Sequence, residues 1–228
     1  MKQTTYTDAK VLNQQFSKRI AGLLQEGIDN HGQASLIVSG GRTPQGLFAC
    51  LSEAELDWSK VVVSLADERW VPATDDASNE KMVREHLLKG KAARAQFVGL
   101  KNAATEAQQG VADCVANLRE IPQPFDVLIL GMGEDGHTAS LFPCSKQIGQ
   151  GLDMDYPRPY LAVQPATAPN WRMSLSLAAL LNSKHIFLHL TGDAKRAVLD
   201  KALAGEDEFE MPIRAVLKRA EVELVWAP

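Results

Sequence analysis

The chain has 228 residues, of which 45% are hydrophobic and 23% are charged, and its formal net charge at pH 7 is −4. This apolar content excludes a disordered chain, and no apolar run approaches the roughly 18 to 20 residues that a membrane-spanning helix needs. Binding to nucleic acid is disfavoured as well, because that function requires a basic surface and this chain is mildly acidic.

The cysteines and the first residues of the chain bear on its location. Cys50, Cys114 and Cys144 show no spacing typical of a disulfide framework, which favours a reducing, cytoplasmic compartment. Residues 1–8 contain no apolar stretch, so they do not resemble a signal peptide. No Pro/Gly-rich linker divides the sequence, and we expect residues 1–228 to form one α/β domain.

The first predicted elements are a helix, a strand and a second helix. Apolar residues recur at helical spacing from Asp8 to about Ile28, which predicts an amphipathic helix with Thr7 as its N-cap. The short apolar run Ala34–Val38 predicts a buried strand. The turn Ser39–Pro44 follows it, and Thr43 suits the N-cap of the helix that begins there.

The same alternation continues along the chain. Val61–Leu65 predicts a strand that leads into the polar segment Asp67–Pro72, and a helix is expected from Ser78 towards Leu88. Phe125–Leu130 is the strongest predicted strand. The remaining expected elements are a helix at Glu106–Arg119, a surface loop at Gly149–Pro159, strands at Tyr160–Gln164, His185–Leu190 and Val222–Trp226, and a helix at Ala194–Ala204.

Strands separated by helices imply βαβ units and a mainly parallel sheet that is buried on both faces. In such sheets, ligands bind beyond the carboxyl ends of the strands. Unusual polar clusters follow Val38, Leu65 and Leu130, at the ends of three predicted strands. We therefore expect these clusters to form a single site.

The first cluster, Ser39–Pro44, joins a strand to a helix N-terminus, where free N–H groups and the helix dipole favour a bound anion. Gly40 and Gly41 would let the backbone approach a phosphate group closely. The cluster lacks the Gly-Lys-Ser/Thr ending of a P-loop and the spacing of the dinucleotide fingerprint. An ordinary turn before a helix is an equally good interpretation of this segment alone.

The second cluster places Asp67, Glu68 and Arg69 directly after a buried strand. Taken alone, this group is more typical of a solvated loop with a local ion pair. Functional residues nevertheless gather on loops that rigid strands hold in place. The planar guanidinium of Arg69 would suit a phosphate group or a developing oxyanion.

The third cluster, Gly131–Pro143, is the most informative. Three glycines make a sharply turned loop, and His137 stands at its end, two residues after Asp135. An imidazole titrates near neutrality and can take a proton from water, while a carboxylate can orient its ring. Although a lone histidine is more often structural, this setting favours a catalytic role. The sequence leaves open whether Asp135, Asp67 or Glu68 contacts the ring.

A serine hydrolase and a metal enzyme are less well supported. Ser140 lacks the Gly-x-Ser-x-Gly elbow that presents a nucleophile. His185 and His189 lie in a predicted strand, where a spacing of four residues separates them by about 13 Å. Two further cations, Arg172 and Lys195, indicate only surface charge when each is considered alone.

Taken together, these segments resemble the 6-phosphogluconolactonase family, and the Gly131–Pro143 segment is the most specific. Arg42 stands where the family frequently has Ser, and Cys144 stands where Gly is common. The segments that carry the resemblance appear in the expected order over nearly the whole chain: Ser39–Pro44, Asp67–Pro72, Ser78-Asn79, Gly131–Pro143, the approach to Arg172, Gly192-x-x-Lys195 and Met211-Pro212.

The resemblance implies a three-layer α/β sandwich, shared with glucosamine-6-phosphate deaminases and ribose-5-phosphate isomerases. It implies hydrolysis of 6-phospho-D-glucono-1,5-lactone to 6-phospho-D-gluconate, the second step of the oxidative pentose phosphate pathway, without a cofactor or metal. Water would attack directly, with His137 as base, Asp135 orienting it and Arg69 stabilising the oxyanion. The residues expected to bind the substrate and its phosphate are Gly40, Gly41, Arg42, Thr43, Asp67, Arg172 and Lys195.

Two rival functions fit less well. In the related deaminases, the segment after the histidine typically reads Ile-Ala-Phe-Asn-Glu-Pro, whereas Thr138–Pro143 contains neither Asn nor Glu. A non-catalytic sugar-phosphate sensor should carry a DNA-binding helix pair, but a single helix precedes the first predicted strand. The expected partner is a small sugar-phosphate lactone, with no nucleic acid or membrane, and the expected state is a monomer or weak homodimer.

Overall fold

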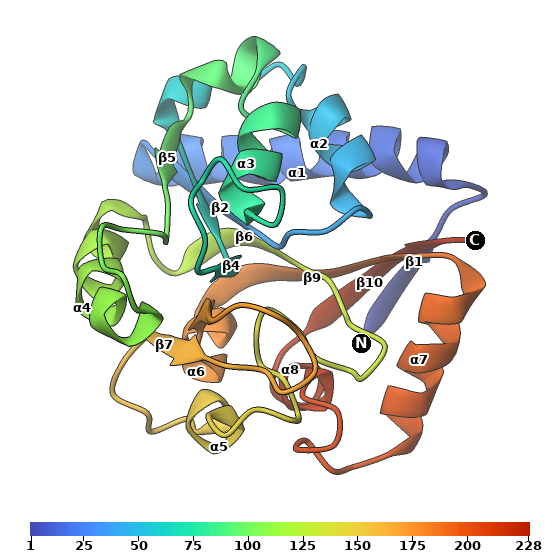
Figure 1. Ribbon diagram of the computed structural model, residues 1–228. Helices are drawn as coiled ribbons and strands as arrows, with labels where there is room; N and C mark the ends of the chain where they lie inside the picture. Colours follow the sequence, from blue (N-terminus) through green and yellow to red (C-terminus); the bar gives the residue numbers. More distant parts are fainter.

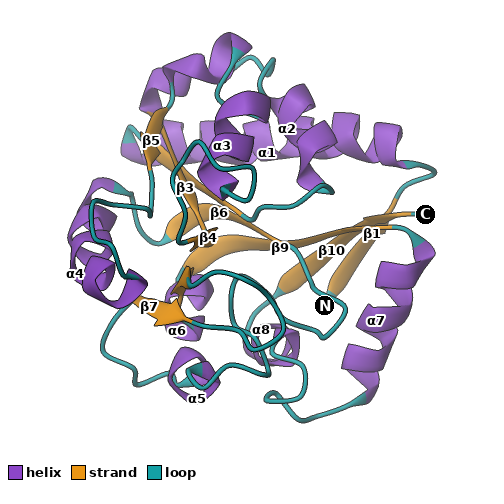
Figure 2. Ribbon diagram, viewed as in Figure 1, coloured by secondary structure: helices purple, strands orange, loops and turns teal.

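A computed structural model describes residues 1–228 and is built around a seven-stranded sheet in which every paired strand is parallel (Figures 1 and 2). The strand order is β1-β10-β9-β6-β2-β3-β5. The strands are β1 (Lys2–Thr5), β2 (Ala34–Val38), β3 (Val61–Leu65), β5 (Gln96–Val98), β6 (Phe125–Leu130), β9 (Ser183–Thr191) and β10 (Val222–Ala227).

Helices cover both faces of this sheet, which gives three layers. Figure 1 shows α1, α2 and α3 above the sheet and α4 to α8 below it. The helices are α1 (Ala9–His31), α2 (Pro44–Leu51), α3 (Asn79–His86), α4 (Ala107–Asn117), α5 (Ile148–Leu152), α6 (Leu177–Leu181), α7 (Asp193–Ala204) and α8 (Ile213–Arg219). The expected α/β class with a mainly parallel sheet is confirmed. None of these helices combines the length and apolarity needed to cross a membrane.

A second, three-stranded antiparallel sheet lies among the lower elements, in the order β4-β8-β7. Its strands are β4 (Asp67–Arg69), β8 (Arg172–Leu175) and β7 (Tyr160–Val163). The expected strand at Tyr160–Gln164 therefore exists but belongs to this small sheet. The interpretation of Asp67, Glu68 and Arg69 as a solvated loop is wrong, because these residues form β4 and Glu68 is fully buried.

Two local expectations are corrected at helix ends. Asp8, not Thr7, is the N-cap of α1: its extended backbone lets the carboxylate accept from the Val11 N–H at 2.8 Å. The Thr7 hydroxyl instead donates to Asp8. Thr43 precedes α2 as expected, but its side chain makes no capping hydrogen bond. The expected loop at Gly149–Pro159 includes most of α5.

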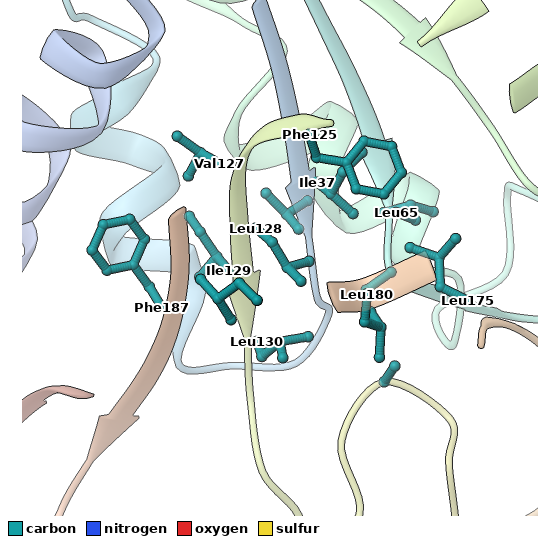
Figure 3. Close-up of a cluster of buried hydrophobic side chains, with 14 of the residues drawn as sticks. Ile37, Leu65, Phe125, Val127, Leu128, Ile129, Leu130, Leu175, Leu180 and Phe187 are labelled. Atoms are coloured by element: carbon teal, nitrogen blue, oxygen red, sulfur yellow. The ribbon is translucent and has the colours of Figure 1, made fainter. Parts of the chain in front are cut away.

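The core lies on both sides of β6, all six residues of which are buried. Figure 3 shows Phe187 on one side of this strand and Leu175 and Leu180 on the other. The 60 buried hydrophobic residues form one continuous cluster. Because burial of each large apolar side chain contributes about 1.5–3 kcal/mol, this packing fixes the strand ends firmly.

The strand order places a crevice between β2 and β6. From β2 the chain proceeds to β3 on one side, whereas from β6 it proceeds through later elements to β9 on the other. The loops that leave these two neighbouring strands therefore diverge at their carboxyl ends. This divergence is the position at which open α/β sheets bind ligands.

Candidate active site

A pocket of about 340 Å³ lies at the carboxyl ends of β2, β6 and β9. Its walls come from the loop after β2, from β4 and β8, from the loop after β6 and from the start of α7. Nine of the ten predicted site residues line it: Gly40, Gly41, Arg42, Thr43, Asp67, Arg69, His137, Arg172 and Lys195. The tenth, Asp135, is not part of the lining but contacts His137.

The His137 ring is oriented by Asp135. Nδ1 of the ring lies 2.6 Å from Oδ1 of Asp135, and the backbone N–H of His137 donates to the same oxygen at 3.1 Å. Because an ionised carboxylate only accepts hydrogen bonds, this contact favours the tautomer with the proton on Nδ1 and a lone pair on Nε2. A Cβ at Gly133 would lie 2.1 Å from Nδ1, so glycine there makes room for the pair.

The charge of the Asp135 carboxylate is supported by the same contact. Partial burial acts to raise the pKa of Asp135, but the hydrogen bonds and charge of His137 lower it below its ordinary value. The carboxylate therefore remains ionised at neutral pH.

Asp67 and Glu68, the other two acids near this segment, make hydrogen bonds to other partners. Asp67 accepts a hydrogen bond from the Ser140 hydroxyl at 2.5 Å. Glu68 accepts from the backbone N–H groups of Asn79 and Glu80, both at 2.7 Å, and thereby holds the N-terminus of α3. Burial raises the pKa of Glu68, and these hydrogen bonds oppose that effect. The geometry thus selects Asp135 as the partner of His137.

Two arginines face the pocket from adjacent strands. Arg69 of β4 pairs with Arg172 of β8 in the antiparallel register. Arg69 donates to the Ala77 carbonyl at 2.6 Å, but its Nε has no partner, and the Nε of Arg172 has none either. Burial lowers the pKa of Arg172, the Arg69 charge lowers it further, and Asp67 opposes both. Such a pair favours the binding of an anion.

The remaining cations and the glycine-rich loop complete the walls. Lys195, in the first turn of α7, donates to the Met132 carbonyl at 2.9 Å and so links α7 to the loop after β6. Arg42 is exposed at the rim. A Cβ at Gly40 would lie 1.8 Å from Oδ1 of Asn79, whose amide donates to the Asp67 carbonyl at 2.8 Å. Gly40 therefore permits close packing of the loop after β2 against the N-terminus of α3.

The positive charges of the pocket are not neutralised by ion pairs. Twelve ion pairs form elsewhere or between His137 and Asp135, and none of them includes a pocket arginine or Lys195. The four cations that line the pocket, none of them with a carboxylate within 4 Å, are Arg42, Arg69, Arg172 and Lys195. The pocket is thus locally positive on a chain of net charge −4.

Sequence reasoning missed one titratable residue of the pocket, His189. His189 was interpreted only as part of a strand, yet it lines the pocket wall from β9, 3% exposed and with no partner for either ring nitrogen. Burial lowers its pKa to about 4, so the ring is neutral at pH 7. No signal in the sequence could have found it, because apolar strand patterns do not reveal which position borders a cavity.

Residues 7–226 match the family described as glucosamine-6-phosphate isomerases/6-phosphogluconolactonase. A 6-phosphogluconolactonase of Pseudomonas aeruginosa is 46% identical over 213 residues, which cover 93% of this chain and 89% of the relative. The crystal structure of a 6-phosphogluconolactonase from Shewanella baltica has a TM-score of 0.97 at 46% identity, covering 100% of this chain and 98% of that one.

The fold extends to a related enzyme class. A monomeric glucosamine-6-phosphate deaminase has a TM-score of 0.81 at 17% identity, covering 100% of this chain and 97% of that one. This likeness confirms the expected fold. The match over residues 7–226 and the relative at 46% identity show that the chain belongs to the family of glucosamine-6-phosphate isomerases and 6-phosphogluconolactonases.

Proposed function

We propose that the pocket is the active site for hydrolysis of 6-phospho-D-glucono-1,5-lactone to 6-phospho-D-gluconate, with His137 as general base. Relatives at 46% and 40% identity are named 6-phosphogluconolactonases, after this activity. The reaction is the second step of the oxidative pentose phosphate pathway. The chain is accordingly a 6-phosphogluconolactonase, a carboxylic ester hydrolase acting on a sugar phosphate.

One observation carries the assignment of the site. Four cations without carboxylate partners line the same pocket as a histidine whose Nδ1 is held by a carboxylate. The cations suit the phosphate group of the substrate, and the histidine suits proton removal from water. A bound phosphate fixes the lactone carbon relative to the base, so binding energy from the phosphate serves the reaction at C1.

The reaction begins with water attacking C1 of the lactone. Nε2 of His137 accepts a proton from this water while Asp135 stabilises the resulting imidazolium. A general base of this kind contributes typically ~10²–10⁴-fold to the rate. When the bond between C1 and the ring oxygen breaks, the imidazolium returns the proton to that oxygen. The lactone is an activated ester, so neither a covalent nucleophile nor a cofactor is required.

The cations divide into two roles. Arg69 stabilises the carbonyl oxygen of the lactone as it becomes negative, because its Nε has no partner in the protein. Arg172 and Lys195 hold the phosphate together with Arg42 and the backbone of the glycine-rich loop. Asp67 accepts a substrate hydroxyl beside its contact with Ser140.

The test is an assay of lactone hydrolysis with His137→Ala, after subtraction of the spontaneous rate. A loss of kcat of about 10²-fold or more is expected. Retention of the wild-type kcat would show that another group is the base. The melting transition of the variant must match that of the wild type, so that loss of the fold is excluded.

A deaminase is the second candidate, since the fold is shared with that class. Thr138–Pro143 argues against it, because this segment has no Asn or Glu. Release of ammonia from glucosamine 6-phosphate, with no lactone hydrolysis, would favour the deaminase.

For the compartment we propose the cytoplasm, which the three free cysteines favour, and for the assembly a monomer or weak homodimer.

A further inference from the structure

Phe142 stacks on the ring of His137. The two ring centroids are 4.0 Å apart and the ring planes differ by 26°. Phe142 lies five residues after His137 in the same loop and is 4% exposed, so its own position is fixed by packing. This contact is independent of the hydrogen bond to Asp135, because it is made by the face of the imidazole and not by its edge.

The same phenyl ring also supports Arg172. The central guanidinium carbon of Arg172 lies 5.4 Å from the centroid of the Phe142 ring, within the range of a cation–π contact. Arg172 makes no ion pair, and its Nε has no hydrogen-bond partner. One aromatic side chain therefore contacts both the proposed base and a proposed phosphate-binding residue.

We propose that Phe142 is a positioning residue that sets the orientation of His137 and Arg172 together. This inference rests on the proposed function of the site. A single hydrogen bond at Nδ1 leaves the imidazole free to pivot about the line to Asp135, and a stacked ring removes that freedom. Nε2 then points in one direction, as a base must for efficient proton transfer.

An aromatic support has a particular advantage for Arg172. A phenyl ring has no oxygen that accepts the N–H groups of the guanidinium, so these donors remain available for a phosphate group. A carboxylate partner would hold the side chain as well, but it would occupy those donors and cancel the charge. Phe142 thus orients Arg172 without competing with the substrate.

The experiment replaces the ring by an aliphatic side chain. Phe142→Leu is expected to lower kcat for lactone hydrolysis about tenfold and to raise KM about threefold, since aromatic and cation–π contacts have modest energies. Phe125→Leu is the matched control. Phe125 is 1% exposed at the opposite end of β6, outside the pocket, so this variant loses similar packing but should keep both constants.

A spectroscopic measurement on the wild-type protein gives a second test that does not depend on how the variant folds. The stacked phenyl ring should shift the carbon-bound protons of His137 upfield of those of the exposed His31, in NMR spectra assigned with His137→Ala. The shift should disappear in Phe142→Leu and persist in Phe125→Leu.

The results separate this inference from the proposed function. Random-coil shifts for His137 in the wild type, or equal kinetic constants in both Phe→Leu variants, would overturn the role of Phe142. A fall in kcat with unchanged KM would overturn its action on Arg172. If His137→Ala were fully active, the proposed base itself would fail, whatever the result for Phe142.

Discussion

Asp135→Asn tests whether the hydrogen bond to His137 does more than hold the loop. In the native chain, the carboxylate accepts from Nδ1 at 2.6 Å and favours the tautomer with a free lone pair on Nε2. An amide is neutral, and it can offer its NH2 group to Nδ1. That arrangement moves the ring proton to Nε2, the atom that we propose accepts a proton from water.

The size of the effect follows from the exposure of the pair. A hydrogen bond to a charged group contributes about 1.5–3 kcal/mol. The Asp135 side chain is 38% exposed, so solvent weakens the interaction and the lower part of this range applies. At 1.4 kcal/mol for each factor of ten, Asp135→Asn should lower kcat about ten- to thirtyfold. KM should stay constant, because Asp135 does not line the pocket.

The assay measures initial rates of lactone hydrolysis by proton release in weak buffer, with the spontaneous rate subtracted. Glu134→Gln is the matched control, since it removes the neighbouring exposed carboxylate. A kcat for Asp135→Asn within twofold of the wild type would refute the orienting role of Asp135. An equal loss in Glu134→Gln would instead assign the effect to the net charge of the loop.

Two further predictions concern binding and stability. Lys195→Ala should raise KM about tenfold or more with little change in kcat. The control Lys201→Ala removes an exposed charge on the same helix and should leave both constants unchanged. A fall in kcat alone would instead place Lys195 at the reacting carbon. His189 has a pKa of about 4 in the folded chain and an ordinary value of 6.5, so the unfolded chain binds the extra proton and stability falls as the pH drops from 6.5 towards 4. Between pH 6.5 and 5, the free energy of unfolding of His189→Leu should fall by roughly 2 kcal/mol less than that of the wild type. Urea unfolding at both pH values measures this difference. An identical pH dependence of the two proteins would contradict the prediction.

The elements that could be predicted from the sequence are those whose local residue pattern is enough to indicate a strand or a helix. β2, β3 and β6 are mainly apolar runs that suit burial on both faces of a sheet, and α1 carries a clear helical periodicity. β1 was missed, because Lys2–Thr5 is polar and its strand form depends on pairing with β10 at the other end of the chain. Such pairing leaves no local trace.

The candidate site shows the same division. The sequence places Asp135 and His137 in one turn, which favours their pairing, but the choice between Asp135, Asp67 and Glu68 needs the structure. The burial of Glu68 could not be predicted, since it depends on N–H groups that α3 supplies from ten or more residues away. The contact of Phe142 with Arg172 of β8 is likewise a tertiary feature. Local motifs therefore identify the reactive groups, and long-range packing decides how they are held.

The distribution of charge determines how salt should affect catalysis. The substrate is an anion and the chain has a net charge of −4, so long-range forces alone would repel the substrate. The four pocket cations act over short distances and attract it. Raising the ionic strength from about 0.01 to 0.15 M shortens the Debye length from about 30 to 8 Å. If attraction by the pocket cations exceeds repulsion by the net charge, kcat/KM should fall severalfold over this range of ionic strength, with kcat nearly constant. An increase in kcat/KM would mean that screening relieves repulsion by the whole surface, and the local attraction argued from Arg42, Arg69, Arg172 and Lys195 would then be too weak to govern binding.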